Sequence, residues 1–212
     1  MGRTPRLSIV EPMHVISGRF KGAPLATPKP GTRPTTDRTK EAIFSRLDSW
    51  GVLGDARVLD LFAGTGALGI EALSRGARSL VAVESAAPAA ALIAKTLTSL
   101  KRHHAWDAAT SARVIRARAE KFVSSGGVGG PFDVIFIDPP YAFETEACSE
   151  LLDGIVANDL TAPGAVIVLE RSARSDDPTM PAGWSVTDRR DYGETAVFYI
   201  EQDPDAEATS AA

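Results

Sequence analysis

The stretch that decides the fold is Val58-Leu59-Asp60-Leu61-Phe62-Ala63-Gly64-Thr65-Gly66-Ala67-Leu68-Gly69. An apolar run typical of a strand leads into a glycine-rich turn, and small and apolar residues typical of a helix follow. Gly64 and Gly66 permit a tight turn and close approach of the backbone to a ligand, which suits a nucleotide-like molecule at the start of the helix. Because the Gly-x-Gly-x-x-Gly spacing also fits a dinucleotide site, the glycines alone leave the ligand open. Asp60 favours a cationic ligand, since a carboxylate beside the turn repels a pyrophosphate and attracts a sulfonium or an ammonium.

A second motif, Asp138-Pro139-Pro140-Tyr141, follows the apolar run 132–137, at the point where a buried strand ends. The two prolines fix φ near about −65° and remove two backbone donors, so the Asp138 carboxylate and the Pro139 carbonyl remain as acceptors. Tyr141 can supply a stacking face. The motif therefore suits a planar base with an exocyclic amine, because the acceptors would take both amine hydrogens and leave the nitrogen lone pair able to attack a methyl group.

Length and composition limit the class of protein. The chain has 212 residues, of which 44% are hydrophobic, enough for one α/β domain with an appendage. A single cysteine, Cys148, excludes an internal disulfide and a cysteine-rich metal site, and the three histidines show no metal-ligand spacing, so we expect no metal. Since no apolar run reaches about 18 residues and the start does not resemble a signal peptide, we expect a cytoplasmic protein without membrane contact.

Charge is unevenly distributed along the chain. Residues 1–46 carry nine basic and three acidic side chains, a balance of +6, whereas the remainder has a balance of −10. A basic segment on an acidic body is typical of an arm that meets nucleic-acid phosphates. We therefore divide the chain into a basic RNA-facing arm (1–46), a catalytic domain (47–202) and an acidic, Ala-rich tail (203–212) that we expect to be disordered.

Strand and helix patterns alternate along the rest of the chain. We expect strands at 14–22, 57–62, 79–84, 112–116, 132–137, 165–170, 184–188 and 195–200, and helices from Asp37 to about Trp50 and at 67–75, 88–100, 119–124 and 144–156. This order predicts an α/β fold with a mostly parallel, Rossmann-like sheet and an antiparallel hairpin at its edge. Ligands bind at the carboxyl ends of such strands, where Asp60, Glu84 and Asp138 would meet and Glu84 could accept two ribose hydroxyls.

Taken together, the motifs resemble the class I S-adenosylmethionine-dependent methyltransferases, and more narrowly the bacterial enzymes that methylate N2 of a guanine in 16S ribosomal RNA. The resemblance covers about residues 13–201. It rests also on the strings Ile16-Ser17-Gly18, Thr32-Arg33-Pro34-Thr35-Thr36-Asp37-Arg38-Thr39-Lys40-Glu41-Ala42-Ile43-Phe44, Glu71-Ala72-Leu73-Ser74-Arg75-Gly76-Ala77 and Tyr192-Gly193-Glu194-Thr195.

The resemblance implies S-adenosylmethionine as cofactor and 16S ribosomal RNA, alone or within an assembling small-subunit particle, as the partner of a monomeric enzyme. It implies cofactor contacts at Asp60, Phe62, Ala63, Gly64, Thr65, Gly66, Glu84 and Ser85, catalysis at Asp138, Pro139, Pro140 and Tyr141, and substrate contacts at Arg19, Arg33, Thr36 and Arg38. One position departs from the family pattern. The acidic residue that usually holds the adenine amine is absent from Arg116-Ala117-Arg118-Ala119, so we expect backbone groups of 117–119 and apolar walls to hold the adenine.

Three other functions remain open at this stage. A DNA adenine-N6 or cytosine-N4 methyltransferase uses a similar tetrapeptide, but a core of about 170 residues leaves little room for a DNA-recognition region. A nicotinamide-dependent oxidoreductase would place Asp60 against the pyrophosphate. A non-catalytic RNA-binding module that has kept the fold would not bind the cofactor.

Overall fold

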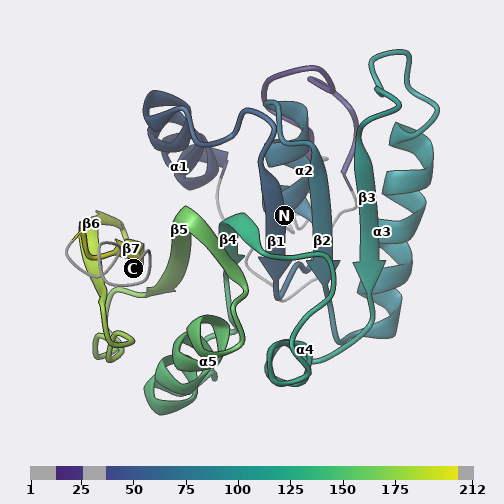
Figure 1. Ribbon diagram of the computed structural model, residues 1–212. Coiled ribbons are helices and arrows are strands. Elements are labelled where there is room, and N and C mark those ends of the chain that lie inside the picture. The colour runs from purple at the N-terminus through teal and green to yellow at the C-terminus, as the bar shows by residue number, and fades with distance from the viewer. Residues whose placement is uncertain (1–12, 26–36, 205–212) are drawn as a thin grey trace, which may run out of the picture.

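The computed structural model describes residues 13–25 and 37–204, which form a single seven-stranded sheet covered by helices (Figure 1). The strand order is β3-β2-β1-β4-β5-β7-β6. The strands are β1 (Arg57–Leu61), β2 (Ser79–Val83), β3 (Ser111–Ile115), β4 (Phe132–Ile137), β5 (Thr161–Ser172), β6 (Trp184–Tyr192) and β7 (Thr195–Gln202). The helices are α1 (Asp37–Trp50), α2 (Ala67–Ser74), α3 (Ala87–Leu100), α4 (Ala119–Ser124) and α5 (Thr145–Ala157).

The topology confirms the predicted sheet. Strands β1 to β5 pair in parallel, and β7 runs antiparallel to both β5 and β6, which makes the last two strands the expected edge hairpin. Strand β1 lies between β2 and β4, so the chain reverses its direction of travel across the sheet at that point. In an open α/β sheet, a ligand binds at the carboxyl ends of the strands beside such a switch.

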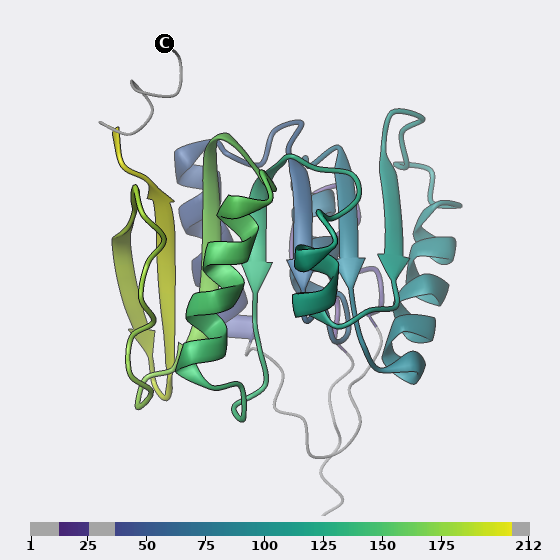
Figure 2. The same ribbon diagram turned by 60° about the horizontal axis from the view of Figure 1, so that its bottom comes forward.

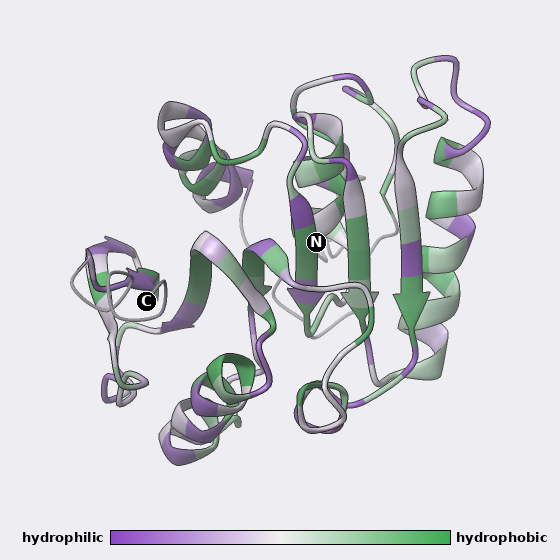
Figure 3. Cartoon of the chain, in the orientation of Figure 1, coloured by the Kyte–Doolittle hydropathy of each residue, from purple (hydrophilic) through white to green (hydrophobic). Residues whose placement is uncertain are grey.

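Helices cover both faces of the sheet, and the strands alternate their side chains between the two layers. Val58 and Val134 pack with residues of α1, α2 and α3 on one face. Leu59 and Leu61 pack with α4 and α5 on the other, which stand in front of the sheet in Figure 2. The sheet centre is accordingly the most hydrophobic part of the molecule, as Figure 3 shows. The apolar runs of β1, β2 and β4 are buried on both faces, as expected for the central strands of a parallel sheet.

The segment 13–25 is attached to α2 and does not form the predicted strand. Only one bridge, between His14 and Pro24, has strand geometry, so the prediction of a strand at 14–22 is wrong. The carboxylate of Glu71 accepts the backbone N–H groups of Ile16 and Ser17 at 2.7 and 2.9 Å. These tertiary hydrogen bonds replace a sheet partner and seat the segment on the domain. The predicted boundary at residue 46 falls inside α1, which also packs on this face.

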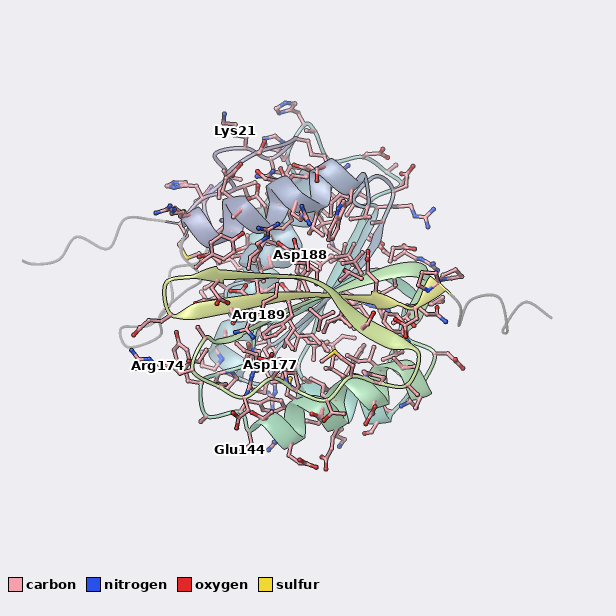
Figure 4. All side chains as sticks on the ribbon, turned by 90° about the vertical axis from the view of Figure 1, so that its left-hand side faces the viewer. Lys21, Glu144, Arg174, Asp177, Asp188 and Arg189 are labelled. Carbon is pink, nitrogen blue, oxygen red and sulfur yellow. The ribbon has the colours of Figure 1, made fainter. Side chains whose placement is uncertain are left out.

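The outer strand β6 extends four residues beyond the predicted range 184–188, through a run of charged residues that Figure 4 views from the edge. Arg189 donates to both carboxylate oxygens of Asp177 at 2.9 Å, and Arg190 donates to Asp188 at 3.1 Å. An edge strand can carry such side chains because its outer side faces solvent, and the charges oppose pairing with another sheet. In the described part of the chain, every helix is too short or too polar to cross a membrane.

Candidate active site

A cavity of about 1130 Å³ opens at the carboxyl ends of β1, β2, β4 and β5. Both motifs of the sequence line it. The residues predicted to bind the cofactor that lie on its wall are Asp60, Phe62, Ala63, Gly64, Thr65, Glu84 and Ser85, and all four predicted catalytic residues, Asp138 to Tyr141, are there as well. Gly66 lies behind the wall, where its φ of 75° lets the turn enter α2. The fold thus brings together side chains that are up to 81 positions apart in sequence.

The carboxylate of Glu84 holds the glycine turn against the end of β2. One of its oxygens accepts the N–H of Gly64 at 2.8 Å, and the other accepts the N–H of Ala86 at 2.7 Å. Each carboxylate oxygen can accept more than one hydrogen bond, so the same group can also accept ribose hydroxyls. The turn needs glycine at Gly64, which has a φ of 57°.

Asp60 is a buried carboxylate between this turn and α2. Its side chain accepts the N–H of Gly69 at 2.9 Å, and the residue is only 2% exposed. The pKa of Asp60 is raised to about 7: burial is the main cause, the hydrogen bond from Gly69 opposes the shift, and the nearby charges of Asp138 and Glu84 add to it. A carboxyl group with these neighbours is stabilised in its charged form by a cation. This part of the cavity therefore fits the sulfonium and ammonium of S-adenosylmethionine.

The affinity for S-adenosylmethionine is expected to depend on pH through Asp60. A bound cation lowers the pKa of this carboxyl below its value in the unliganded protein, so binding below about pH 7 must release a proton. We expect the affinity to be constant above pH 7 and to fall by up to about tenfold per pH unit as the pH decreases below it. Calorimetry between pH 5.5 and 8.5 measures this slope.

Two comparisons assign the slope to Asp60. The variant Asp60→Asn keeps an oxygen for Gly69 and cannot titrate, so its affinity should be lower but independent of pH in this range. S-adenosylhomocysteine lacks the sulfonium and should show a shallower slope. An equal slope for Asp60→Asn and the wild type would assign the titration to another group.

A buried arginine ties the second motif to the body of the domain. Arg171, on β5, donates from Nη1 to the carbonyl of Phe143 at 2.6 Å and from Nη2 to Oγ1 of Thr145 at 3.0 Å. The N–H of Phe143 in turn donates to the carbonyl of Pro140 at 2.8 Å. The ring of Phe143 meets that of Phe62 edge to face, with centroids 5.1 Å apart. Arg171 thereby fixes the loop after Asp138 and, through the two rings, connects it to the glycine turn.

We expect Arg171→Lys to slow the reaction about tenfold while leaving the cofactor affinity within a factor of about three. A lysine keeps the charge but cannot reach both acceptors, so the loop would sample positions in which Asp138 is misaligned with the amine. Steady-state kinetics combined with cofactor calorimetry measure both quantities. Arg113→Lys is the matched control, because Arg113 also donates to a loop carbonyl, Val128 at 2.8 Å, outside the cavity. An unchanged kcat in Arg171→Lys would contradict the positioning role.

The predicted substrate-binding residues fall in different places. The guanidinium of Arg19 donates to the carbonyls of Leu73 at 2.9 Å and Ala77 at 2.7 Å, so it caps the carboxyl end of α2 away from the cavity. Arg38 is exposed on α1. Arg33 and Thr36 lie outside the described residues. A substrate contact at any of the four stays a prediction, and substitution of Arg19 would also disturb the α2 end.

The segment that follows β3 lines the cavity and carries no acidic residue before Glu120, as the sequence indicated. Arg118 lines the wall there but is exposed and donates to Glu120 at 2.8 Å, and Glu120 lines the same wall. Glu120 is the first acidic residue after β3, and it lies at the cavity on the short helix α4, which begins at Ala119. Adenine binding by the backbone groups of 117–119 and by apolar walls stays a prediction.

Sequence reasoning missed part of the wall. Glu170 and Arg171 on β5 line the cavity, as do Thr39 on α1 and residues 192–195 at the β6–β7 turn. A signal for Glu170 was present, since it follows an apolar run just as Glu84 and Asp138 do. No metal is indicated: across residues 13–25 and 37–204, no group of three or more His, Cys, Asp and Glu side chains is arranged to hold one.

Known proteins resemble this chain both in amino-acid sequence and in fold. A family model described as "Conserved hypothetical protein 95" matches residues 13–201. The chain is 34% identical over 197 residues to ribosomal RNA small subunit methyltransferase D of Escherichia coli (strain K12), covering 92% of this chain and 93% of that relative. The solved structure of yhhF from Escherichia coli superposes with a TM-score of 0.76 at 33% identity, covering 90% and 98% of the two chains.

A more distant structure supports the fold alone. Magnesium protoporphyrin IX methyltransferase from Synechocystis PCC 6803, solved with bound S-adenosylmethionine, superposes with a TM-score of 0.59 at 13% identity, covering 78% of this chain and 79% of that one. The family match and the 34% identical relative span nearly the whole chain. The protein therefore belongs to the "Conserved hypothetical protein 95" family, which is the family of ribosomal RNA small subunit methyltransferase D, and it is a methyltransferase with the class I Rossmann-like fold.

Proposed function

We propose that the protein transfers the methyl group of S-adenosylmethionine to the exocyclic N2 amine of a guanine in small-subunit (16S) ribosomal RNA. One observation carries this proposal: the glycine turn and the Asp138 loop open onto the same cavity and contact each other through Phe62 and Phe143. A cofactor on the turn would therefore point its reactive end at a base held by the loop. Bringing the two reactants into one orientation supplies a large part of the rate.

The residues around the turn fit S-adenosylmethionine, which supplies the electrophilic methyl group when bound. Asp60 is buried with a raised pKa, and a positive charge beside it would be stabilised. Glu84 stands at the end of β2 with acceptor capacity for ribose hydroxyls. Asp60 would face the pyrophosphate of a nicotinamide dinucleotide and repel it, which argues against the oxidoreductase alternative.

The loop would orient the amine of the target base. Asp138 and the carbonyl of Pro139 accept its two hydrogens, and Tyr141, which is 67% exposed, can cover the face of a base that enters from solvent. Hydrogen bonds to both hydrogens localise the nitrogen lone pair, which attacks the methyl carbon. The proton leaves during or after the transfer, because the methylated amine is strongly acidic while it carries a positive charge. The role of Asp138 is therefore to orient the amine, and it need not remove the proton.

The name of the Escherichia coli relative supports small-subunit ribosomal RNA as the substrate. The basic segment 1–46 supports an RNA partner independently, because its balance of +6 contrasts with the acidic remainder. We further propose that the protein acts as a monomer in the cytoplasm, on 16S ribosomal RNA either alone or within an assembling particle.

Mass spectrometry of ribosomal RNA nucleosides from cells with and without the gene tests this function. The proposal predicts that N2-methylguanosine from the small subunit decreases by one residue per RNA molecule when the gene is deleted, and that oligonucleotide mapping locates it. An unchanged nucleoside profile would support the non-catalytic alternative. Loss of N6-methyladenine or N4-methylcytosine from DNA would support the DNA methyltransferase alternative instead.

A further inference from the structure

Glu170 lies beside Asp138 at the carboxyl end of the neighbouring strand. The β4–β5 register pairs Ile137 with Leu169, so Asp138 and Glu170 are the next positions along the two chains, about 5 Å apart between backbones. Val134 and Val168, at the same parity, both pack on the α1–α3 face. Because side chains alternate along a strand, Glu170 belongs to that face. Asp138 follows the end of β4, and its charge acts on Asp60, whose carboxylate accepts from Gly69 of α2 on the same face.

Glu170 is also part of the cavity wall, although it is only 4% exposed. The cavity is large for a single small molecule, since pockets for such ligands measure about 300 to 1,000 Å³. The glycine turn and Glu84 occupy one part of the wall, and the Asp138 loop, Glu170 and the β6–β7 turn form another. The second part is where a base oriented by Asp138 would lie, so Glu170 is placed to contact its edge.

We propose that Glu170 selects guanine by accepting its N1–H, while Asp138 and the carbonyl of Pro139 accept the two hydrogens of N2. An ionised carboxylate can only accept hydrogen bonds, and among the common bases with an exocyclic amine only guanine carries a ring N–H donor beside that amine. Adenine and cytosine present a ring-nitrogen acceptor beside the amine, which would face a carboxylate oxygen. This inference rests on the proposed function and adds a residue that determines base specificity.

The complementary chemistry of glutamine gives a direct test. An amide has nearly the same shape as a carboxylate but offers one donor and one acceptor. It therefore matches 2-aminopurine, which carries the same N2 amine beside an N1 acceptor. We expect the wild type to prefer guanine over 2-aminopurine by about 10- to 100-fold, and Glu170→Gln to reduce or reverse that preference.

The assay uses small-subunit RNA, or the particle if only that is methylated, in which splinted ligation places guanine or 2-aminopurine at the nucleotide mapped by mass spectrometry. Rates of methyl transfer from labelled S-adenosylmethionine give the base preference of each protein. Cofactor affinity and melting temperature are measured on the same proteins and should be close to wild type. Glu146→Gln, the same chemical change at an exposed site on α5, is the matched control and should keep the wild-type preference.

The outcomes separate the inference from the function on which it rests. Guanine N2 methylation by the wild type together with an unchanged base preference in Glu170→Gln would overturn the role of Glu170 and leave the function intact. So would an equal loss on both bases with normal cofactor binding, since that points to a structural role. If the wild type does not methylate guanine at all, the proposed function fails and this inference with it.

Discussion

Asp138→Ala is expected to bind S-adenosylmethionine with nearly normal affinity yet transfer methyl groups about 10²- to 10³-fold more slowly. The carboxylate stands at the end of β4 on the cavity wall, where it would accept a hydrogen of the amine as positive charge develops on the nitrogen. Removal of one preorganised polar group from such a transition state costs about this much. Single-turnover kinetics with saturating cofactor measure the loss in the chemical step.

Asp138→Asn separates hydrogen bonding from charge. Its carbonyl oxygen can still accept from the amine, so the loss should be smaller than for alanine. Calorimetry on both variants provides the control, because a variant whose glycine turn is still folded should bind the cofactor with nearly normal affinity. A wild-type rate in Asp138→Ala would remove this residue from the mechanism.

Glu84→Ala is expected to weaken S-adenosylmethionine binding by about 1 to 3 kcal/mol, which corresponds to roughly 5- to 150-fold. The variant loses the ribose acceptor and leaves the N–H groups of Gly64 and Ala86 without the oxygens that hold the turn. The effect should therefore appear mainly in the dissociation constant, with a kcat at saturating cofactor that falls much less. Calorimetry and steady-state kinetics together distinguish the two.

A second carboxylate makes a matched control for Glu84. Asp133 also accepts a backbone N–H, that of Arg57 at 2.7 Å, but it lies at the amino end of β4, far from the cavity. Asp133→Ala should cost folding stability and leave the cofactor affinity unchanged. Equal weakening by both substitutions would indicate that the loss reflects general destabilisation.

The helices and strands that the sequence predicted correctly are those that are specified by residues close together in the chain. Apolar runs at 132–137 and 165–170 are strands because they are buried on both faces, and polar residues at their ends mark the ligand edge. Strand β5 begins earlier than predicted, at Thr161, because the Pro163–Gly164 pair resembles a turn while the sheet accommodates it at an irregularity in the pairing with β4. The predicted range of β6 was too short for a similar reason. Its run of charged residues does not resemble a strand, and such a run is tolerated only at the edge of a sheet.

The parts of the site that could not be predicted depend on contacts between distant segments. Nothing in the pattern around Arg171 indicates that it reaches the carbonyl of Phe143, 28 positions away. The segment 14–22 has the composition of a strand, but Glu71 and Ser74 bind its backbone and give it another conformation. The bonds of Arg19 to the carbonyls of Leu73 and Ala77, more than 50 positions away, could likewise not be predicted from the sequence.

Methyl transfer by the purified protein tests the central claim most directly. The protein is incubated with methyl-labelled S-adenosylmethionine and 16S ribosomal RNA, or small-subunit particles that lack the modification, and the digested nucleosides are separated by mass spectrometry. A cavity that holds the cofactor on the Gly64 turn and a guanine against Asp138 predicts label in N2-methylguanosine, close to one methyl group per RNA molecule, and far slower incorporation of label with Asp138→Ala. Label in another nucleoside, or no label in either RNA or particles, would contradict the account.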